Sequence, residues 1–183
     1  MPTRQVEGAT LIIFGGLPGV GKTSLARELA RQIGAVHLRI DSIEFAIWAA
    51  GRGRQAMDDV GYRVAHAVAA DNLRVGNIVI ADAVNPVAVT RTAVVGSGRW
   101  LAGAGVEIEV MCSDRDEHRR RAEARASDIP GFTPPTWEEV LSREYHQWDR
   151  EHLVIDTSGR TVAQNVCTIR ELLSQQKALP PGR

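Results

Sequence analysis

Lysine is nearly absent from the sequence. Only Lys22 and Lys177 are lysines, and the other 20 of the 22 cationic residues are arginines. The cations are balanced by 22 acidic residues, so the formal net charge at pH 7 is zero. A neutral chain lacks the broad positive field that non-specific binding to nucleic acids or anionic membranes usually requires. The balance disfavours nucleic acid as a partner, although it is compatible with a local basic site.

Cysteine and long apolar runs are scarce too. Cys112 and Cys167 lie far apart and form no C-x-x-C pair, so we expect free, buried thiols rather than a disulfide framework or a zinc site. No stretch approaches the roughly 20 consecutive apolar residues of a membrane span. The N-terminus also lacks the basic and then apolar regions of a signal peptide. The sequence therefore predicts a cytoplasmic protein with no membrane partner.

The sequence does contain a regular alternation of short apolar runs and longer segments of helical period, which is typical of a parallel sheet with crossover helices. With 183 residues, 44% of them hydrophobic, we expect one domain over 1–183, with a core at about 9–175 and a lid at about 115–136. The apolar runs predict strands at Thr10–Phe14, Val36–Ile40, Asn77–Ala81, Val106–Met111 and Leu153–Ile155. The remaining segments predict helices at about 22–33, 42–50, 56–75, 86–102, 114–126, 136–149 and 161–177.

A phosphate-binding motif directly follows the first predicted strand. Residues 16–23 read G-L-P-G-V-G-K-T, a complete G-x-x-x-x-G-K-[ST] that opens into a helix. In such a P-loop the glycines let backbone N–H groups turn towards phosphate oxygens, the lysine neutralises the β- and γ-phosphates, and the threonine hydroxyl binds magnesium. We therefore predict binding of ATP and Mg²⁺, with nucleotide contacts from Gly16, Leu17, Pro18, Gly19, Val20, Gly21, Lys22, Thr23 and Ser24.

The scarcity of lysine narrows the class of P-loop protein. Guanine recognition through N-K-x-D is impossible, because the second lysine, Lys177, follows Gln176. Transporter ATPases and AAA motors need a signature loop or a helical lid domain that a chain of this length does not accommodate. The predicted fold class is therefore α/β, a three-layer P-loop NTPase fold with a five-stranded parallel sheet of the nucleoside-monophosphate-kinase type.

Two aspartates follow the second and third predicted strands. The carboxyl ends of parallel strands form the edge of the sheet where ligands bind. We predict that Asp41 orients the acceptor hydroxyl or acts as its general base, and that Asp82, together with Thr23, holds magnesium through water. The two roles could be exchanged, and either aspartate could instead cap the helix that follows it.

Several further side chains are candidates at the same edge. The residues predicted to contact the acceptor, besides Asp41, are Arg39, Trp48, Asn85 and Arg91. On the predicted lid helix, Arg121 and Arg125 could close over the polyphosphate and stabilise charge in the transition state, as catalytic residues alongside Lys22, Asp41 and Asp82. The alternative for the arginines is a solvated cationic face paired with Glu117 and Glu123.

Together these motifs resemble the zeta-toxin-like or AAA_33-type kinases, relatives of chloramphenicol phosphotransferases, adenylyl-sulfate kinases and polynucleotide 5′-hydroxyl kinases. The resemblance extends from Leu11 to about Leu173. It rests on GGLPGVGKTSLA at 15–26, HLRID at 37–41, IVIADAVNP at 78–86, HRRRAEAR at 118–125 and LVIDTSG at 153–159. The resemblance implies that the strand ending near Thr157 and Gly159 passes beside adenine, and that Arg121 or Arg119 lies near the base.

One departure bears on the acceptor. Polynucleotide kinases of this type carry an arginine three positions after the aspartate of the second strand, where this chain has Glu44. We therefore expect an ATP-dependent phosphotransferase that moves the γ-phosphoryl group to a hydroxyl of a small molecule, such as an antibiotic, a sugar or a nucleoside. A polynucleotide 5′-hydroxyl kinase and an ATP-dependent switch or toxin-like effector are the alternatives. The sequence leaves the identity of the acceptor and the oligomeric state open.

Overall fold

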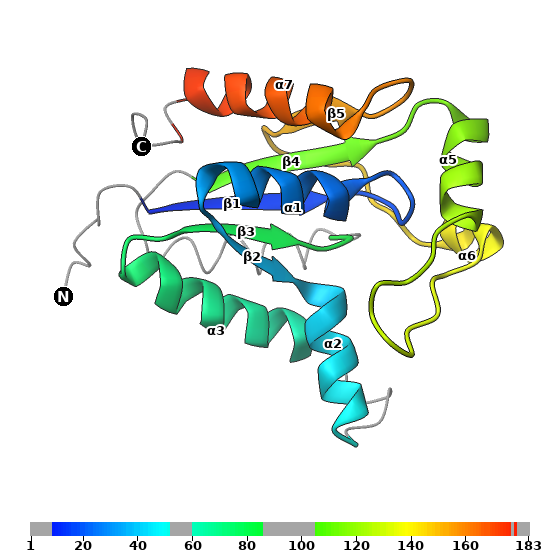
Figure 1. The fold of residues 1–183 in the computed structure, drawn as a ribbon, viewed down its shortest axis with the longest axis horizontal. Helices are drawn as coiled ribbons and strands as arrows, with labels where there is room; N and C mark the ends of the chain where they lie inside the picture. Colours follow the sequence, from blue (N-terminus) through cyan, green and yellow to red (C-terminus); the bar gives the residue numbers. More distant parts are fainter. Residues whose placement is uncertain (1–8, 52–59, 86–104, 177, 179–183) are drawn as a thin grey trace.

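Five parallel strands form the centre of the protein (Figure 1). The computed structural model describes residues 9–51, 60–85, 105–176 and 178. The strands are β1 (Thr10–Gly15), β2 (Val36–Arg39), β3 (Ile78–Asp82), β4 (Gly105–Met111) and β5 (Leu153–Asp156), in the spatial order β2-β3-β1-β4-β5. All strand pairs are parallel. Each predicted strand is confirmed to within one residue at either end.

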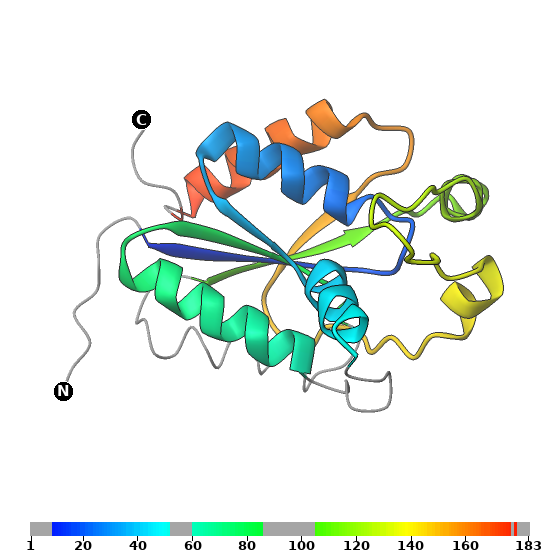
Figure 2. The ribbon, with the colours of Figure 1, turned by 60° about the horizontal axis from the view of Figure 1, so that its bottom comes forward.

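Helices cover both faces of this sheet. They are α1 (Lys22–Ile33), α2 (Ile40–Ala49), α3 (Val60–Arg74), α5 (Arg115–Glu123), α6 (Trp137–Ser142) and α7 (Val162–Gln175). Helices α1 and α7 lie on one face and α3 lies on the other (Figure 2). The predicted α/β fold with three layers is therefore confirmed. The predicted helix at 86–102, which carries Arg91, lies outside the described residues.

The two sides of the core follow from the alternation of side chains along β1. Ile12 and Phe14 pack with residues of α1 and α7, whereas Leu11 and Ile13 pack with Ala69 and Leu73 of α3. All four β1 side chains are at most 5% exposed. The strand that leads into the P-loop is thus the most completely enclosed element, which fixes the position of the loop.

The helix predicted at 136–149 is shorter than expected, because α6 ends at Ser142. Arg143 takes an extended backbone conformation, and the chain then returns so that Trp148 is buried at 7% exposure. A Cβ atom at Gly15 would lie 2.4 Å from the Trp148 ring. Burial of this large aromatic surface beside β1 outweighs continuation of the helix, so the prediction that Trp148 lies on a helix is wrong.

The prediction of two buried thiols is also wrong. Cys112 is partly buried, but Cys167 is exposed, and both are free. On α7 the buried positions include Val166, Ile169 and Leu173, and Cys167 lies outside this stripe. No helix among the described segments is long and apolar enough to cross a membrane.

The different burial of β4 and the edge strand β5 predicts a specific pattern of stability. Ile108 on β4 is fully buried, whereas Val154 on the neighbouring β5 is 52% exposed. The Ile108→Ala substitution should lower the free energy of unfolding by about 2–5 kcal/mol, because it leaves a cavity between the sheet and α1. Val154→Ala should change it by less than about 1 kcal/mol. Urea denaturation followed by circular dichroism measures both, and equal losses would contradict the proposed core.

Candidate active site

The P-loop connects β1 to α1 in a conformation that needs glycine. Gly16, Gly19 and Gly21 have positive φ angles of 137°, 88° and 100°. A Cβ atom at Gly16 would lie only 2.1 Å from the carbonyl oxygen of Val110 on β4. Because neither the backbone conformation nor the space admits a side chain, the loop can pass close to the sheet and turn its N–H groups towards a ligand.

Lys22 is buried at the base of this loop. Its side chain is 7% exposed, and Nζ donates a hydrogen bond to the carbonyl oxygen of Leu17 at 2.9 Å. Burial lowers the pKa of Lys22 to about 8, although the charges of Asp82 and Asp41 act to raise it. The ammonium group is therefore incompletely compensated within the protein, and a bound polyphosphate would supply the missing negative charge.

The two predicted aspartates lie at the carboxyl edge of the sheet. Asp82 ends β3 and is in register with Arg39, the last residue of β2. Burial acts to raise the pKa of Asp82, but hydrogen bonds from His37 and Thr23 and the charge of Lys22 lower it below its ordinary range. Asp41 lies in the first turn of α2. Both carboxylates act electrostatically on Lys22, so the structure brings the three predicted catalytic groups together.

Thr23 and Asp82 fit the magnesium ion that a P-loop implies. The Thr23 hydroxyl, in the first turn of α1, helps to lower the pKa of the Asp82 carboxyl at the end of β3, so two oxygen-bearing side chains lie close together. Oxygen ligands suit Mg²⁺, which binds through few protein groups and keeps several of its water molecules. The role of these two residues in metal binding stays a prediction.

Arg121 and Thr157 link the lid helix, the P-loop and the end of β5. The Arg121 guanidinium donates to the hydroxyl of Thr157 at 2.9 Å and to its carbonyl oxygen at 3.1 Å. The Thr157 hydroxyl in turn donates to the carbonyl oxygen of Val20 at 2.9 Å. Glu117 accepts hydrogen bonds from Arg121 and from the backbone N–H of Gly159. These contacts form one side of the site where the resemblance expects adenine.

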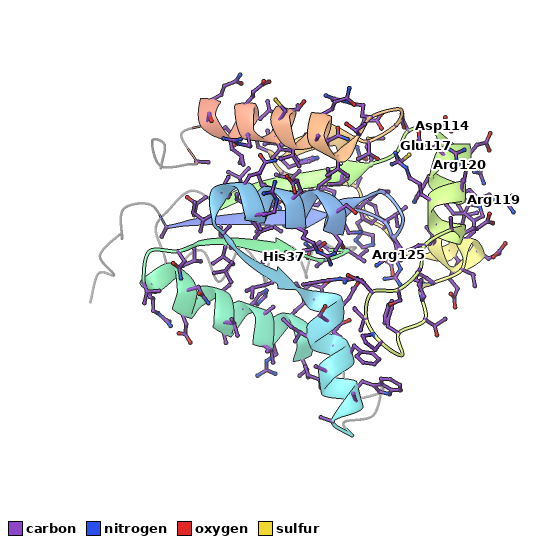
Figure 3. The ribbon with its side chains drawn as sticks, viewed as in Figure 1. His37, Asp114, Glu117, Arg119, Arg120 and Arg125 are labelled. Atoms are coloured by element: carbon purple, nitrogen blue, oxygen red, sulfur yellow. The ribbon has the colours of Figure 1, made fainter. Side chains whose placement is uncertain are left out.

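The arginines of the predicted lid separate into two groups. Arg119 pairs with Glu123 at 2.8 Å and its side chain is 56% exposed, and Figure 3 shows Arg119 and Arg120 on the outer side of α5. Arg125, just after α5, lies on the side that faces α1 (Figure 3), and with Arg121 it lines a cavity of about 630 Å³. The solvated alternative therefore describes Arg119. Arg121 forms the expected pair with Glu117, but it is 30% exposed and lines the cavity with Arg125, and contact of these two arginines with a nucleotide stays a prediction.

Helix α5 packs directly on the P-loop, through contacts that the sequence did not indicate. The His118 ring lies 2.8 Å from the carbonyl oxygen of Pro18 and packs edge to face against Trp137. A Cβ atom at Gly19 would lie 3.0 Å from Cβ of Ala122. The histidine shows no spacing typical of ligands or catalysis, so only the three-dimensional structure reveals it as the link between lid and loop.

A cavity of about 630 Å³ extends from the P-loop to the lid and to the end of β2. Gly19 and Gly21 of the P-loop, Thr23, Thr157 and several charged residues are among those that line it. The charged residues comprise six cations and one carboxylate: Lys22, Arg27, Arg39, Arg121, Arg125, Arg160 and Asp128. In a chain of zero net charge, this concentration of positive charge marks the cavity as an anion-binding site.

The acceptor side of the site contains a second carboxylate that sequence analysis did not assign to it. Glu44 lies one turn after Asp41 on α2, and its side chain packs over Gly61, where a Cβ atom would lie 2.3 Å from Cγ of Glu44. Burial, helped by the charge of Asp41, raises the pKa of Glu44 to about 7, while Arg143 acts to lower it. Helical spacing from Asp41 is the signal that could have identified it.

Two other predicted acceptor contacts differ in exposure. Trp48 is 40% exposed, and the centroids of the Trp48 and Phe45 rings are 5.3 Å apart. Trp48 is therefore accessible at the end of α2. Asn85 is fully buried with a φ of 49°, and its side-chain amide donates to the carbonyl oxygen of Phe14 at 3.0 Å. Asn85 thus connects the ends of β3 and β1. Contact of either residue with an acceptor stays a prediction.

The fold and its phosphate-binding loop define the class of small P-loop kinase-like proteins, with the strand order 2-3-1-4-5. Within this class the chain belongs to the AAA_33 family, described as an AAA domain, whose model matches residues 11–142. No curated protein matches the chain in sequence.

Solved structures share the fold at low sequence identity. The chain is similar to the APS kinase CysC of Mycobacterium tuberculosis, solved with AMPPNP and APS, at 22% identity and a TM-score of 0.69, over 91% of this chain and 98% of that chain. It is also similar to a gluconokinase from Sinorhizobium meliloti 1021, at 15% identity, 94% and 99% coverage and a TM-score of 0.59. Kti12 of Chaetomium thermophilum, solved with ADP-AlF3, matches at 21% identity, 88% and 97% coverage and a TM-score of 0.59.

The buried lysine predicts a specific pH dependence of nucleotide binding. In the free protein the pKa of Lys22 is about 8, and bound phosphate favours the charged form. The affinity for ADP should therefore be constant below pH 8 and fall by about tenfold per pH unit above it. Lys22→Arg, which stays charged, should show no such decline. Calorimetric titration between pH 7 and 9.5 measures both, and parallel profiles would exclude this origin.

Proposed function

We propose that this protein is an ATP-dependent kinase that transfers the γ-phosphoryl group of ATP to a hydroxyl group of a small molecule. The observation that carries the proposal is the proximity of two carboxylates, Asp41 and Asp82, to the P-loop ammonium of Lys22, on which both act electrostatically. A protein that only binds nucleotide needs the loop but does not need two carboxylates beside it, one at the end of β3 and one just after β2. Phosphoryl transfer needs them to hold the metal and the acceptor.

In the proposed reaction each group has a distinct task. Asp41 accepts a hydrogen bond and then the proton from the acceptor hydroxyl, whose oxygen attacks the γ-phosphorus in line with the leaving oxygen. The bond between the γ-phosphorus and the β–γ bridging oxygen breaks, and ADP leaves. Lys22, Arg121 and Arg125 stabilise the charge on the transferring group. Magnesium, when bound near Thr23 and Asp82, adds Lewis-acid stabilisation of the phosphate oxygens.

The acidic face of α2 supports a small acceptor over a nucleic acid. Asp41 and Glu44 lie on the same side of this helix, and the charge of Asp41 affects Glu44. The successive phosphodiester groups of a polynucleotide would have to pass both carboxyl groups, which repel them to the extent that Glu44, with a pKa of about 7, is ionised. The similar structures of APS kinase, solved with APS, and of gluconokinase also favour an acceptor of small size.

Substitution of Asp41 separates binding from chemistry. Asp41→Asn should lower kcat by about 10²–10⁴-fold, because it removes the proton acceptor, while the affinity for ADP stays nearly unchanged. Lys22→Ala should abolish both transfer and tight ADP binding. Asp71→Asn is the matched control, since Asp71 is 76% exposed on α3, where it pairs with Arg74. Its activity should equal that of the wild type.

The measurement uses γ-labelled ATP with magnesium and a panel of sugars, nucleosides, hydroxy acids, antibiotics and 5′-hydroxyl oligonucleotides. Labelling of an acceptor by the wild type, lost in Lys22→Ala, supports the kinase. Labelling of the oligonucleotide alone would replace the small-molecule acceptor with a nucleic acid. If the panel stays unlabelled while a stoichiometric protein partner co-purifies with the ATP-bound form, the ATP-dependent switch is the better description.

A further inference from the structure

A single carboxylate bridges two arginines at the mouth of the cavity. Asp128 accepts a hydrogen bond from Arg27 of α1 at 2.5 Å and another from Arg39 of β2 at 2.6 Å, one on each oxygen. It is the single acidic residue among positions 124–136, a stretch we call the lid segment. It is also the single carboxylate among the described residues that line the cavity, where it faces six cations.

Arg39 is buried, and Asp128 satisfies only part of its hydrogen-bonding capacity. Its side chain is 7% exposed. Nη1 bonds to Asp128, but Nε and Nη2 are buried without a hydrogen-bond partner among the described residues. A buried, unpaired donor is costly, and the planar fork of a guanidinium group suits a ligand with several acceptor oxygens. Arg39 is therefore equipped for an anion with more oxygens in reach than Asp128 provides.

Asp128 is able to give up this position. Its side chain is 48% exposed, and residues 125–135 of the lid segment form no helix or strand. Ile129 beside it is buried at 7% exposure, so a displacement of Asp128 concerns its side chain and not the backbone. The half-exposed carboxylate of Asp128 therefore occupies a position between the buried Arg39 and the exposed Arg27 that a stronger anion could take.

The cavity contains more cationic side chains than those expected to contact the polyphosphate of the nucleotide. Lys22, Arg121 and Arg125 line the cavity on the side of the expected polyphosphate, whereas Arg27 and Arg39 are bridged by Asp128. Nη2 of Arg39 lies 4.0 Å from Oδ2 of Asp41, the group expected to take the proton from the acceptor. Any ligand group bound by Arg39 is thus within a few bonds of the hydroxyl that reacts.

We propose that Arg27 and Arg39 form a subsite for an acidic group of the acceptor, and that Asp128 occupies this subsite until the acceptor displaces it. The acceptor class is then an alcohol with a carboxylate, phosphate or sulfate group a few bonds from its hydroxyl. The class of acceptor rests on the proposed kinase function. The anion subsite itself does not, because it follows from Arg27, Arg39 and Asp128.

Binding of inorganic sulfate to the protein saturated with AMPPNP and magnesium tests the subsite, because the P-loop is then filled. Asp128→Asn should bind sulfate about tenfold more tightly than the wild type, because the internal competitor loses its charge. Arg39→Gln should lose this binding, and Arg39→Lys should retain part of it. Arg27→Gln, at an exposed position, provides the same test if Arg39 variants do not fold. Asp71→Asn is the control.

The direction of the Asp128→Asn effect decides between two roles. If Asp128 only latches the lid segment, its substitution weakens AMPPNP binding and leaves sulfate binding at the wild-type level, and the subsite proposal is overturned. Wild-type sulfate affinity in both Arg39→Gln and Arg27→Gln would also overturn it. Calorimetry on each variant gives both affinities.

A kinetic comparison separates this proposal from the kinase function. Acidic alcohols should have a higher kcat/KM than their neutral methyl esters or amides, and Arg39→Gln should raise KM for the acid without changing KM for ATP. Faster turnover of the neutral partner would overturn the acceptor class while the kinase function stands. If sulfate binds as expected but no alcohol is phosphorylated, the kinase function fails and the anion subsite stands.

Discussion

The arrangement of the whole site depends on the burial of one ammonium group. Lys22 is 7% exposed and is held by the carbonyl oxygen of Leu17 and by the charges of Asp82 and Asp41. A buried charge is tolerated only where opposite charges and hydrogen-bond acceptors surround it. The carboxylates can reach it only if β3, which ends in Asp82, lies directly beside β1, and if β2 follows β3. The burial of Lys22 in the loop therefore requires this order of the strands.

On the side of the site where the nucleotide is expected, α5 and the end of β5 both contact the P-loop. His118 and Ala122 of α5 meet the loop from outside, and Thr157 bonds to the carbonyl oxygen of Val20 from the end of β5. Arg121 joins these two supports. Each contact fixes a backbone group of the loop, so the N–H groups that face phosphate are positioned before a ligand binds, which reduces the entropy lost on binding.

The sequence predicts those parts of the structure that depend on a pattern of neighbouring residues. The strands follow from apolar runs, and the P-loop is a contiguous motif in which each residue type has one physical task. Asp82 follows from its place after β3. The remaining parts depend on contacts between distant segments. The α6 helix stops before Trp148, which packs on Gly15, and Asp128 pairs with Arg27 and Arg39, which lie 101 and 89 positions away in sequence. No local periodicity carries that information.

The close approach of Gly19 to Ala122 couples the phosphate loop to the lid helix without any adaptable side chain between them. A hypothetical Cβ at position 19 would lie 3.0 Å from Ala122, in a backbone conformation with a φ of 88°. Because the backbone of Ala122 itself lies close to this position, no rotamer change can make room for a side chain at residue 19. A larger residue at either position would therefore push α5 outward and loosen its contact with the phosphate loop.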